Sequence, residues 1–286
     1  MSGRSLAVLE VGGLVTVQDA GRPGYAHLGV PRAGWLDAPA ALLANRLVGN
    51  PADDAVLEVT LGSLVLRAGG PVWVAVTGAR TALSVDGRAA AFGEPVHVQT
   101  GAVLRIEPPV SGVRAYLAVA GGIDVPAVLG SRSTDTLAWV GPPPVAVGQL
   151  LGVGTSAGDP QPLDTPRPPA PGPVRLLPGP RADWFSTDPV EDLARGPWTV
   201  DAASNRVGLR LEGAPLRRAA AYEGRELASE GMVLGAVQVP PSGQPVVFLA
   251  DHPVTGGYPV AAVVHPDDLW MCAQLRPGEQ LRLRRG

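Results

Sequence analysis

The chain has 286 residues, a net charge of −3 and only 17% charged residues. Its length favours two domains and allows a large buried core. A charge so close to zero gives no reason to expect nucleic-acid binding. No apolar run reaches the roughly 18 residues that a membrane span needs, and the N-terminus carries no long apolar signal segment. We therefore expect a cytoplasmic protein.

Lysine is absent from the sequence, and all 23 basic residues are arginine. A standard phosphate-binding loop and a Schiff-base mechanism both need a lysine, so both are excluded. Biotin is also carried on a lysine amine, so this chain is not itself a biotin carrier. These exclusions hold even if the bias reflects only codon preference. The single cysteine, Cys272, cannot form an internal disulfide, and its apolar neighbours predict a small buried residue rather than a nucleophile.

The first half of the chain predicts a mainly β domain with one helix. The whole chain contains 37 glycines and 31 prolines, as expected for short strands joined by tight turns. Asp37 is a helix N-cap candidate, and residues 37–49 show the spacing of an amphipathic helix that ends at Gly49. We expect strands at residues 6–9, 15–17, 56–59, 64–66, 72–76, 96–98, 103–106 and 116–119.

A proline-rich segment, residues 157–173, separates the two halves and predicts an extended linker. The expected domains are therefore residues 1–156 and 174–286. The second half predicts short helices at 188–195 and 267–274. Its expected strands are residues 174–177, 198–200, 233–239, 246–249 and 260–264.

Two familiar catalytic patterns are not supported. Residues 154–158 match the Gly-x-Ser-x-Gly elbow of hydrolases, but a proline follows at once and no helix can begin there, so we expect a loop. The four histidines are dispersed and lack paired ligand spacing, so no metal site is expected. His252 adjoins Asp251, and we interpret it as a solvated turn histidine.

The polar, glycine-bounded segment 229–260 is the best candidate site. Gln238 is predicted to lie on a strand among small or apolar neighbours, where its amide needs either an internal partner or a ligand. Asp251 follows the next strand, and Gly256 and Gly257 make a turn whose N–H groups can face an amide or anion. A hairpin that only holds its own turns explains the pattern equally well.

The same segment resembles the family of the 5-oxoprolinase C subunit, also called the KipA-type or allophanate hydrolase subunit 2 family. This family is related to the biotin-dependent carboxyltransferase region of urea carboxylases. The resemblance extends in order over nearly the whole chain. The matching segments are residues 16–25, 29–37, 44–50, 57–60, 114–123, 130–135, 204–213, 229–260 and 274–278.

The resemblance implies two cyclophilin-like β-barrel domains with a few short helices. It also implies a cytoplasmic 5-oxoprolinase complex with the B subunit (KipI-type) and the A subunit, which together open 5-oxoproline to glutamate using ATP. Two departures from the family pattern concern activity. Residues 141–149 lack an arginine and an aspartate, and Val260 stands where the family often has lysine.

Each of the other motif residues also has a simple structural interpretation. Asp19 and Arg22 could form an ion pair across a turn. Asn45 lies at the predicted helix C-terminus. Arg206 and Arg210 could pair with nearby glutamates. Taken together, the arginines suit planar anion recognition. The further candidates for a site or an interface are Asp19, Arg22, Asn45, Ser131, Ser133 and Asp135.

The site hypothesis assigns roles by residue chemistry. Asp251 is the candidate proton acceptor or water orienter, with Gln238 and Thr255 holding the amide. Arg206 is the candidate charge clamp, and the Gly256 and Gly257 N–H groups form a candidate oxyanion site. The candidate substrate-binding residues are Arg206, Arg210, Ser229, Glu230, Gly256, Gly257 and Tyr258.

Three functions are weighed. The first is a subunit of an ATP-dependent amidohydrolase, the 5-oxoprolinase complex, in which the location of the ATP site is open. The second is a carboxyltransferase module that takes a carboxyl group from a separate biotin carrier. The third is a non-catalytic regulatory partner of the KipI-type subunit. None of the three uses nucleic acid or a membrane.

Overall fold

The computed structural model describes residues 4–156, 158–161 and 172–286. The chain forms two compact units. The first comprises Met1–Arg22, Ala33–Asp135 and Trp139–Pro168, and the second comprises Pro23–Arg32, Thr136–Ala138 and Pro169–Gly286. Most of the expected linker, residues 157–173, lies outside the described residues, so the domain limits stay a prediction.

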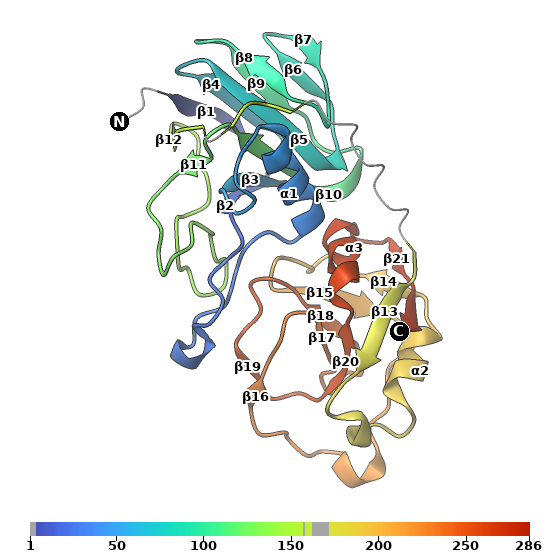
Figure 1. The fold of residues 1–286 in the computed structure, drawn as a ribbon. Helices are drawn as coiled ribbons and strands as arrows, with labels where there is room; N and C mark the ends of the chain where they lie inside the picture. Colours follow the sequence, from blue (N-terminus) through green and yellow to red (C-terminus); the bar gives the residue numbers. More distant parts are fainter. Residues whose placement is uncertain (1–3, 157, 162–171) are drawn as a thin grey trace. The chain divides into compact units, whose positions relative to one another are not determined.

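The first unit is built from two sheets (Figure 1). One has seven strands in the order β11-β12-β1-β4-β9-β6-β7, and the other has five in the order β2-β3-β10-β5-β8. The strands are β1 (Ser5–Val11), β2 (Leu14–Gln18), β3 (Val56–Thr60), β4 (Leu64–Ala68), β5 (Val72–Arg80), β6 (Leu83–Val85), β7 (Arg88–Ala90), β8 (Val96–Val98), β9 (Val103–Ile106), β10 (Ser111–Val119), β11 (Ile123–Asp124) and β12 (Leu150–Val153).

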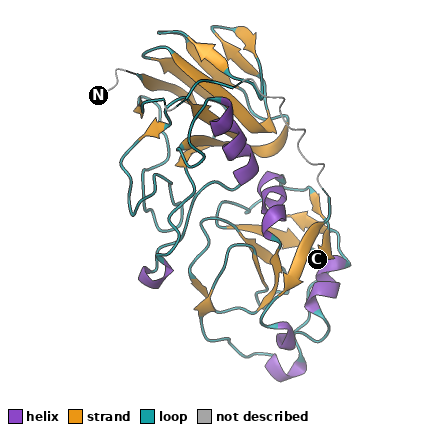
Figure 2. Cartoon of the chain, in the orientation of Figure 1, coloured by secondary structure: helices purple, strands orange, loops and turns teal. Residues whose placement is uncertain are grey.

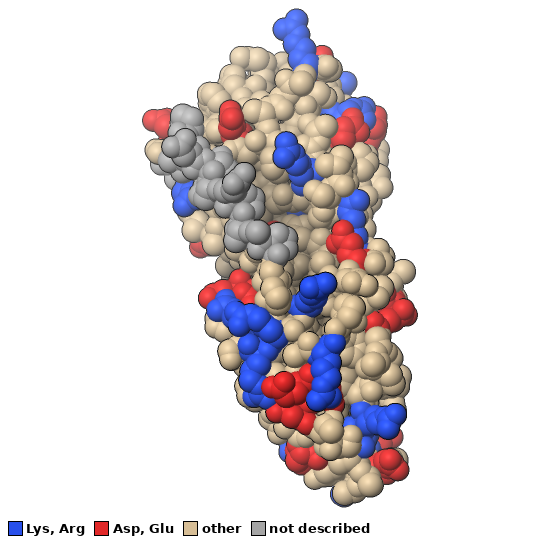
Figure 3. All heavy atoms as spheres, turned by 90° about the vertical axis from the view of Figure 1, so that its right-hand side faces the viewer, with Lys and Arg blue, Asp and Glu red and all other residues tan. Residues whose placement is uncertain are grey.

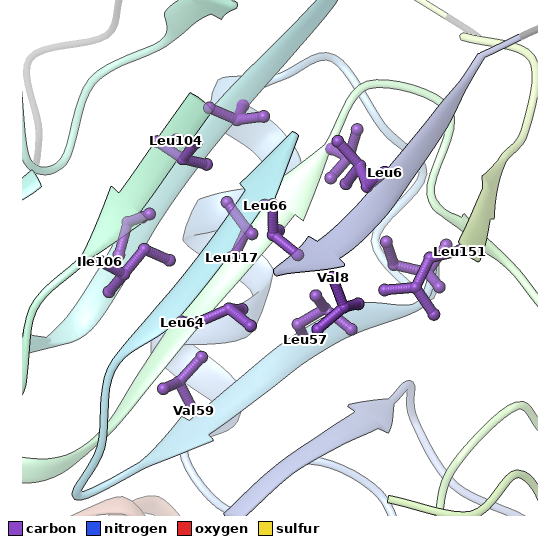
Figure 4. Close-up of a cluster of buried hydrophobic side chains, with 14 of the residues drawn as sticks. Leu6, Val8, Leu57, Val59, Leu64, Leu66, Leu104, Ile106, Leu117 and Leu151 are labelled. Carbon is purple, nitrogen blue, oxygen red and sulfur yellow. The ribbon is translucent and has the colours of Figure 1, made fainter. Parts of the chain in front are cut away.

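Apolar side chains from both sheets make the core of this unit. Along β1 the side chains alternate, so that Leu6 and Val8 turn inward and are 1% exposed. They belong to one buried cluster with Leu57, Leu66 and Leu117 from other strands (Figure 4). Burial of each such side chain contributes about 1.5–3 kcal/mol to folding.

The predicted N-terminal helix is confirmed as α1 (Ala38–Leu47). Asp37 is its N-cap, and the Asp37 side chain accepts a hydrogen bond of 3.0 Å from the Ala40 N–H. The buried face of the helix carries small residues and forms an apolar cluster with Tyr116 of β10. Small side chains allow the helix to lie close to β10 and β5.

The second unit contains an eight-stranded sheet in the order β21-β14-β15-β18-β17-β20-β13-β22 and a small pair, β16-β19. Its strands are β13 (Val174–Pro178), β14 (Trp198–Val200), β15 (Gly208–Glu212), β16 (Glu230–Gly231), β17 (Ala236–Gln238), β18 (Val246–Phe248), β19 (Thr255–Gly256), β20 (Val260–Val264), β21 (Gln280–Leu281) and β22 (Leu283–Arg285).

Short helices complete the fold (Figure 2). The two predicted C-terminal helices are confirmed as α2 (Pro189–Ala194) and α3 (Leu269–Gln274). Single 3-10 turns lie at Ala26–Leu28, Ala182–Trp184, Ala220–Tyr222 and Pro266–Asp268. The mainly β prediction with few short helices is therefore confirmed.

One predicted strand was too long. Only Ala236–Gln238 of the expected strand 233–239 is extended and paired. Gly235 has φ +83°, which strand geometry does not allow, and Val233 is 55% exposed. Gln238 is therefore the last residue of β17, at a register shift in its pairing with β20.

The surface shown in Figure 3 carries both signs of charge, with arginine and acidic side chains next to one another. Among the described residues, no helix is long and apolar enough to cross a membrane.

Candidate functional site

A buried ion pair between Asp251 and Arg206 lies at the centre of the candidate site in the second unit. Arg206 precedes β15, Asp251 follows β18, and their side chains are 1% and 0% exposed. The guanidinium binds in a bidentate manner, with Nε 2.9 Å from Oδ2 and Nη2 3.0 Å from Oδ1. Such pairs are strong and directional. The expectation that Arg206 pairs with a nearby glutamate was wrong, because strand pairing places Asp251 beside it.

Thr136 completes the surroundings of Asp251. Its N–H and its hydroxyl donate hydrogen bonds of 3.0 Å and 2.7 Å to Oδ2 of Asp251. The carboxylate therefore accepts four hydrogen bonds from Arg206 and Thr136, and both of its oxygens are engaged. Both oxygens of the Asp251 carboxylate are therefore held in place by their hydrogen-bond donors. Thr136 was not predicted from the sequence, although it directly follows the 130–135 motif.

His252 is buried, and its interpretation as a solvated turn histidine was wrong. It is 5% exposed, and its ring stacks on Phe248 at 5.8 Å between centroids. Nδ1 lies 2.8 Å from the Pro253 carbonyl oxygen, which can only accept, so Nδ1 carries the proton. Burial lowers the pKa of His252, and Arg32 lowers it further, while the Pro253 carbonyl and Asp251 raise it. The ring is therefore neutral near pH 7, with Nε2 as a proton acceptor.

Gln238 has an internal partner on one side of its amide. Its Nε2 donates to the Tyr258 carbonyl oxygen at 3.1 Å and lies 3.8 Å from the Met232 sulfur. Gln238 is 6% exposed, and no described residue donates a hydrogen bond to its Oε1. The side chain therefore keeps an acceptor for a substrate N–H. Met232 and Phe248 belong to one apolar cluster, which connects Gln238 with the His252 ring.

The β16-β19 pair brings further candidates together. Glu230 pairs with Gly256 in antiparallel register. A Cβ atom at Gly256 would lie 2.5 Å from Nε2 of Gln238, so any larger residue there would force the Gln238 amide to move. A Cβ atom at Gly257 would lie 3.8 Å from the Ser229 hydroxyl oxygen. The structure thus brings residues 229–231 and 255–258 side by side around Gln238.

Glu230 forms an ion pair with Arg181, which was not predicted from the sequence. Nε of Arg181 donates to Oε2 of Glu230 at 3.0 Å, and Nη2 contacts the other oxygen. The remaining candidates are more open to solvent. Thr255, Ser229 and Arg210 are exposed, and Tyr258 is 44% exposed. Arg210 does not take part in the pair between Arg206 and Asp251.

In the first unit, the 130–135 motif and Asp19 form a buried network. The expected ion pair between Asp19 and Arg22 is wrong, because the Asp19 carboxylate instead accepts hydrogen bonds of 2.6 Å from the hydroxyls of both Ser131 and Ser133. Arg22 donates to the carbonyl oxygens of Ser133 and Val128, and it is 1% exposed. The motif hydroxyls and main chain are therefore bound within this network.

Asn45, Asp135 and the altered 141–149 segment also have defined positions. Asn45 lies in the last turn of α1, and its Nδ2 donates to the carbonyl oxygens of Ala52 and Asp54 at 3.2 Å and 2.8 Å. Asp135 is fully buried. Gly141 has φ +95°, and a Cβ atom there would clash with the Ser133 carbonyl oxygen. The altered segment is therefore packed directly against the motif.

Val260 and Cys272, two residues noted in the sequence, are both buried. Val260, which stands where the family often has lysine, lies in β20 and is 4% exposed. Cys272 is buried as predicted, and burial raises the pKa of its thiol to about 12. Among the described residues, no three histidine, cysteine, aspartate or glutamate side chains are placed to hold a metal ion.

Comparison with known proteins gives a consistent result. A family model described as "Carboxyltransferase domain, subdomain A and B" matches residues 28–285. The chain is 39% identical over 280 residues to the C subunit of 5-oxoprolinase from Escherichia coli (strain K12), covering 96% of this chain and 89% of that protein. It is 33% identical over 309 residues to the urea amidolyase of Lachancea kluyveri, covering 96% of this chain but 16% of that protein.

Solved structures show the same similarity. The structure of TTHA0988 matches with a TM-score of 0.88 and 38% identity, covering 99% of this chain and 56% of that chain. The Kluyveromyces lactis urea carboxylase matches with a TM-score of 0.90 and 30% identity, covering 98% of this chain and 27% of that chain. This chain therefore spans about half of TTHA0988 and a smaller part of the urea carboxylase.

Proposed function

The chain belongs to the carboxyltransferase-domain family that includes the 5-oxoprolinase C subunit, and we propose that it acts as the C subunit of a 5-oxoprolinase. The observation that carries this proposal is the similarity to the Escherichia coli protein, which covers 96% of this chain and 89% of that protein. Because that relative is named as a subunit, partner subunits are expected for this chain. We propose that these are the A and B subunits, and that the complex uses ATP to open 5-oxoproline to glutamate.

The geometry of the second unit supports a part in amide chemistry. Oε1 of Gln238 can accept a hydrogen bond from the lactam N–H, since its Nε2 is already bound to the Tyr258 carbonyl. Nε2 of His252 can accept a proton from the attacking water. His252 therefore replaces Asp251 as the proposed proton acceptor, and the buried pair of Asp251 with Arg206 becomes a positioning element.

ATP would activate the lactam before water attacks it. Transfer of a phosphoryl group to the lactam oxygen turns that oxygen into part of a leaving group. Water then adds to the ring carbon and the C–N bond breaks, which leaves the ring nitrogen as an amine and the former ring carbonyl as an acyl phosphate. A second water hydrolyses the acyl phosphate, so that phosphate leaves and the carboxylate forms. The chain has no lysine for a standard phosphate loop. We therefore propose that the partner subunits hold the ATP phosphates or that arginines of this chain contribute.

The test is a reconstituted complex. This chain is co-purified with its A and B subunits, and ATP-dependent formation of glutamate from 5-oxoproline is measured. His252→Gln should lower kcat about a hundredfold or more, as expected for loss of a general base. His97→Gln is the matched control, because His97 is an exposed histidine of the first unit. A complex without ATP-dependent glutamate formation would refute the proposed function, and wild-type kcat in His252→Gln would refute the role of His252.

A carboxyltransferase function is the second candidate, favoured by the family description and by the similarity to urea amidolyase. The chain would then transfer a carboxyl group from a carboxybiotin donor on a separate carrier. Incubation of the complex with carboxybiotin and urea distinguishes the two functions. If carboxybiotin loses its carboxyl group only when urea is present, the carboxyltransferase function is supported. If carboxybiotin stays intact and the complex forms glutamate, the carboxyltransferase function is excluded.

A further inference from the structure

The first unit contains a polar hollow that the proposed function does not use. Its volume is about 360 Å³, and small-molecule pockets usually range from ~300 to 1,000 Å³. Main chain of two glycine-containing turns and several charged side chains surround it. The lining residues that carry the argument are Asp54, Gly121, Gly122, Asp124, Arg132 and Thr155.

One wall of the hollow requires glycine. Gly122 has φ +69°, and a Cβ atom there would lie 3.2 Å from the Asp54 carboxyl group. Gly121 has φ +102°, and a Cβ atom there would clash with the Gly154 carbonyl oxygen. Asn50 holds this turn, since its Oδ1 accepts a hydrogen bond of 2.7 Å from the Gly121 N–H. The absence of side chains leaves the Asp54 carboxyl group against bare main chain.

The part of the lining that contains Arg132 is held by the motif network described above. The Asp19 carboxylate accepts a hydrogen bond of 2.6 Å from the Arg132 N–H, at the same time as those from Ser131 and Ser133. The network therefore fixes the main chain from which the Arg132 side chain extends. Nε of Arg132 donates to the Val125 carbonyl oxygen at 2.9 Å, which directs the guanidinium.

Two charged groups of the lining, Arg132 and Asp54, keep unused hydrogen-bonding capacity. Nη2 of Arg132 lies 3.9 Å from the Asp124 carboxylate, which is longer than a hydrogen bond. Within the described part of the chain, the terminal nitrogens of Arg132 donate no hydrogen bond, and the Asp54 carboxyl group accepts none. The hollow thus presents a guanidinium donor and a carboxylate acceptor that interact electrostatically but are not hydrogen-bonded to each other.

We propose that this hollow binds a small zwitterion of the α-amino acid type, with its ammonium group on Asp54 and its carboxylate on Arg132. A guanidinium binds a carboxylate through two parallel hydrogen bonds. Burial raises the pKa of Asp54 and the neighbouring Asp53 raises it further, while Arg132 lowers it. An ammonium group beside Asp54 offsets both effects, because a nearby positive charge favours the carboxylate form. Ligands that carry only one of the two charges leave the other group without a hydrogen-bonded ligand atom.

Binding to the isolated, full-length chain tests the proposal. Glycine and serine are titrated by calorimetry, and acetate and methylamine serve as probes that carry one charge each. We expect saturable binding of the amino acids and about tenfold weaker binding of each single-charge probe. Because the readout is binding without partner subunits, the result is independent of the proposed 5-oxoprolinase activity.

Matched substitutions locate the site. Asp54→Asn and Arg132→Gln should each weaken binding about tenfold or more. The controls are Glu94→Gln, an exposed carboxylate of the first unit, and Arg67→Gln, an exposed arginine of β4, which should bind as the wild type does. If Arg132→Gln does not fold, Arg132→Lys keeps the charge and removes the bidentate geometry.

Three results would overturn the proposal. The first is the absence of saturable amino-acid binding up to about 10 mM. The second is equal affinity for the amino acids and for methylamine or acetate. The third is unchanged binding in both Asp54→Asn and whichever Arg132 variant folds.

Discussion

Replacing Asp251 by asparagine should strongly destabilise the second unit. The substitution removes the negative charge but leaves the Arg206 guanidinium, 1% exposed, without its counterion. Breaking a buried ion pair by removing one partner costs about 3–5 kcal/mol. The asparagine amide would also point an N–H group at a neighbouring donor, either the Arg206 guanidinium or the Thr136 hydroxyl. The lost ion pair is therefore not replaced by equivalent hydrogen bonds.

Urea unfolding of the purified chain, followed by tryptophan fluorescence, measures this effect. Trp184 and Trp198 lie buried in the second unit and report on it. Thr136→Val is the graded control, because it removes one hydrogen bond to a charged group, worth about 1.5–3 kcal/mol. A double variant with Asp251→Leu and Arg206→Met should be more stable than Asp251→Asn, since no buried charge is left unpaired.

Two outcomes would contradict this prediction. If the unfolding free energy of Asp251→Asn lies within about 1 kcal/mol of the wild-type value, the ion pair does not hold the second unit together. If the double variant is less stable than Asp251→Asn, the cost does not arise from an unpaired charge. In either case Asp251 would be available for a direct part in the reaction.

Three more predictions concern single residues. The lowered pKa of His252 means that the unfolded chain binds the proton more strongly, so stability should be complete above the ordinary histidine pKa of about 6.5 and fall as the pH drops below it. Unfolding free energies at about pH 7.5 and pH 5.5 should show a smaller difference in His252→Gln than in the wild type, and equal differences would contradict the burial argument. Gly256→Ala should displace Gln238, because the new Cβ atom would lie 2.5 Å from Nε2 of Gln238. The KM of the complex for 5-oxoproline should therefore rise. An unchanged KM would argue against Gln238 as a substrate contact. The Cys272 thiol, with its pKa raised to about 12, should not react with a disulfide reagent at neutral pH until the chain unfolds, and rapid reaction of the folded protein would refute its burial.

Local patterns predicted the regular elements well. The capping residue Asp37 and the apolar spacing after it predicted α1, because a helix is stabilised by neighbours three and four residues apart. Runs of valine and leucine predicted only part of the longest strands of the first unit, residues 72–76 of β5 and 116–119 of β10. Strands of two residues, such as β16 and β19, were missed because their only support is pairing with each other.

Contacts between residues far apart in the sequence decided which partners the candidate residues have. The expectation of a proton acceptor at Asp251 came from its position at a strand end, but its partners Arg206 and Thr136 are 45 and 115 residues away. No local pattern indicates that they meet. The burial of His252 likewise depends on Phe248 and on the packing around it.

The sequence by itself determined the mainly β class, the family resemblance and the chemistry excluded by the absence of lysine. These properties depend on residue types and their order, which the chain carries whatever its conformation. Only the tertiary structure decided which polar side chains are buried and with which partners. It placed Asp251 in a buried pair with Arg206, His252 against Phe248 and Arg132 in the lining of a hollow, because burial and ion pairing arise from contacts between distant parts of the chain.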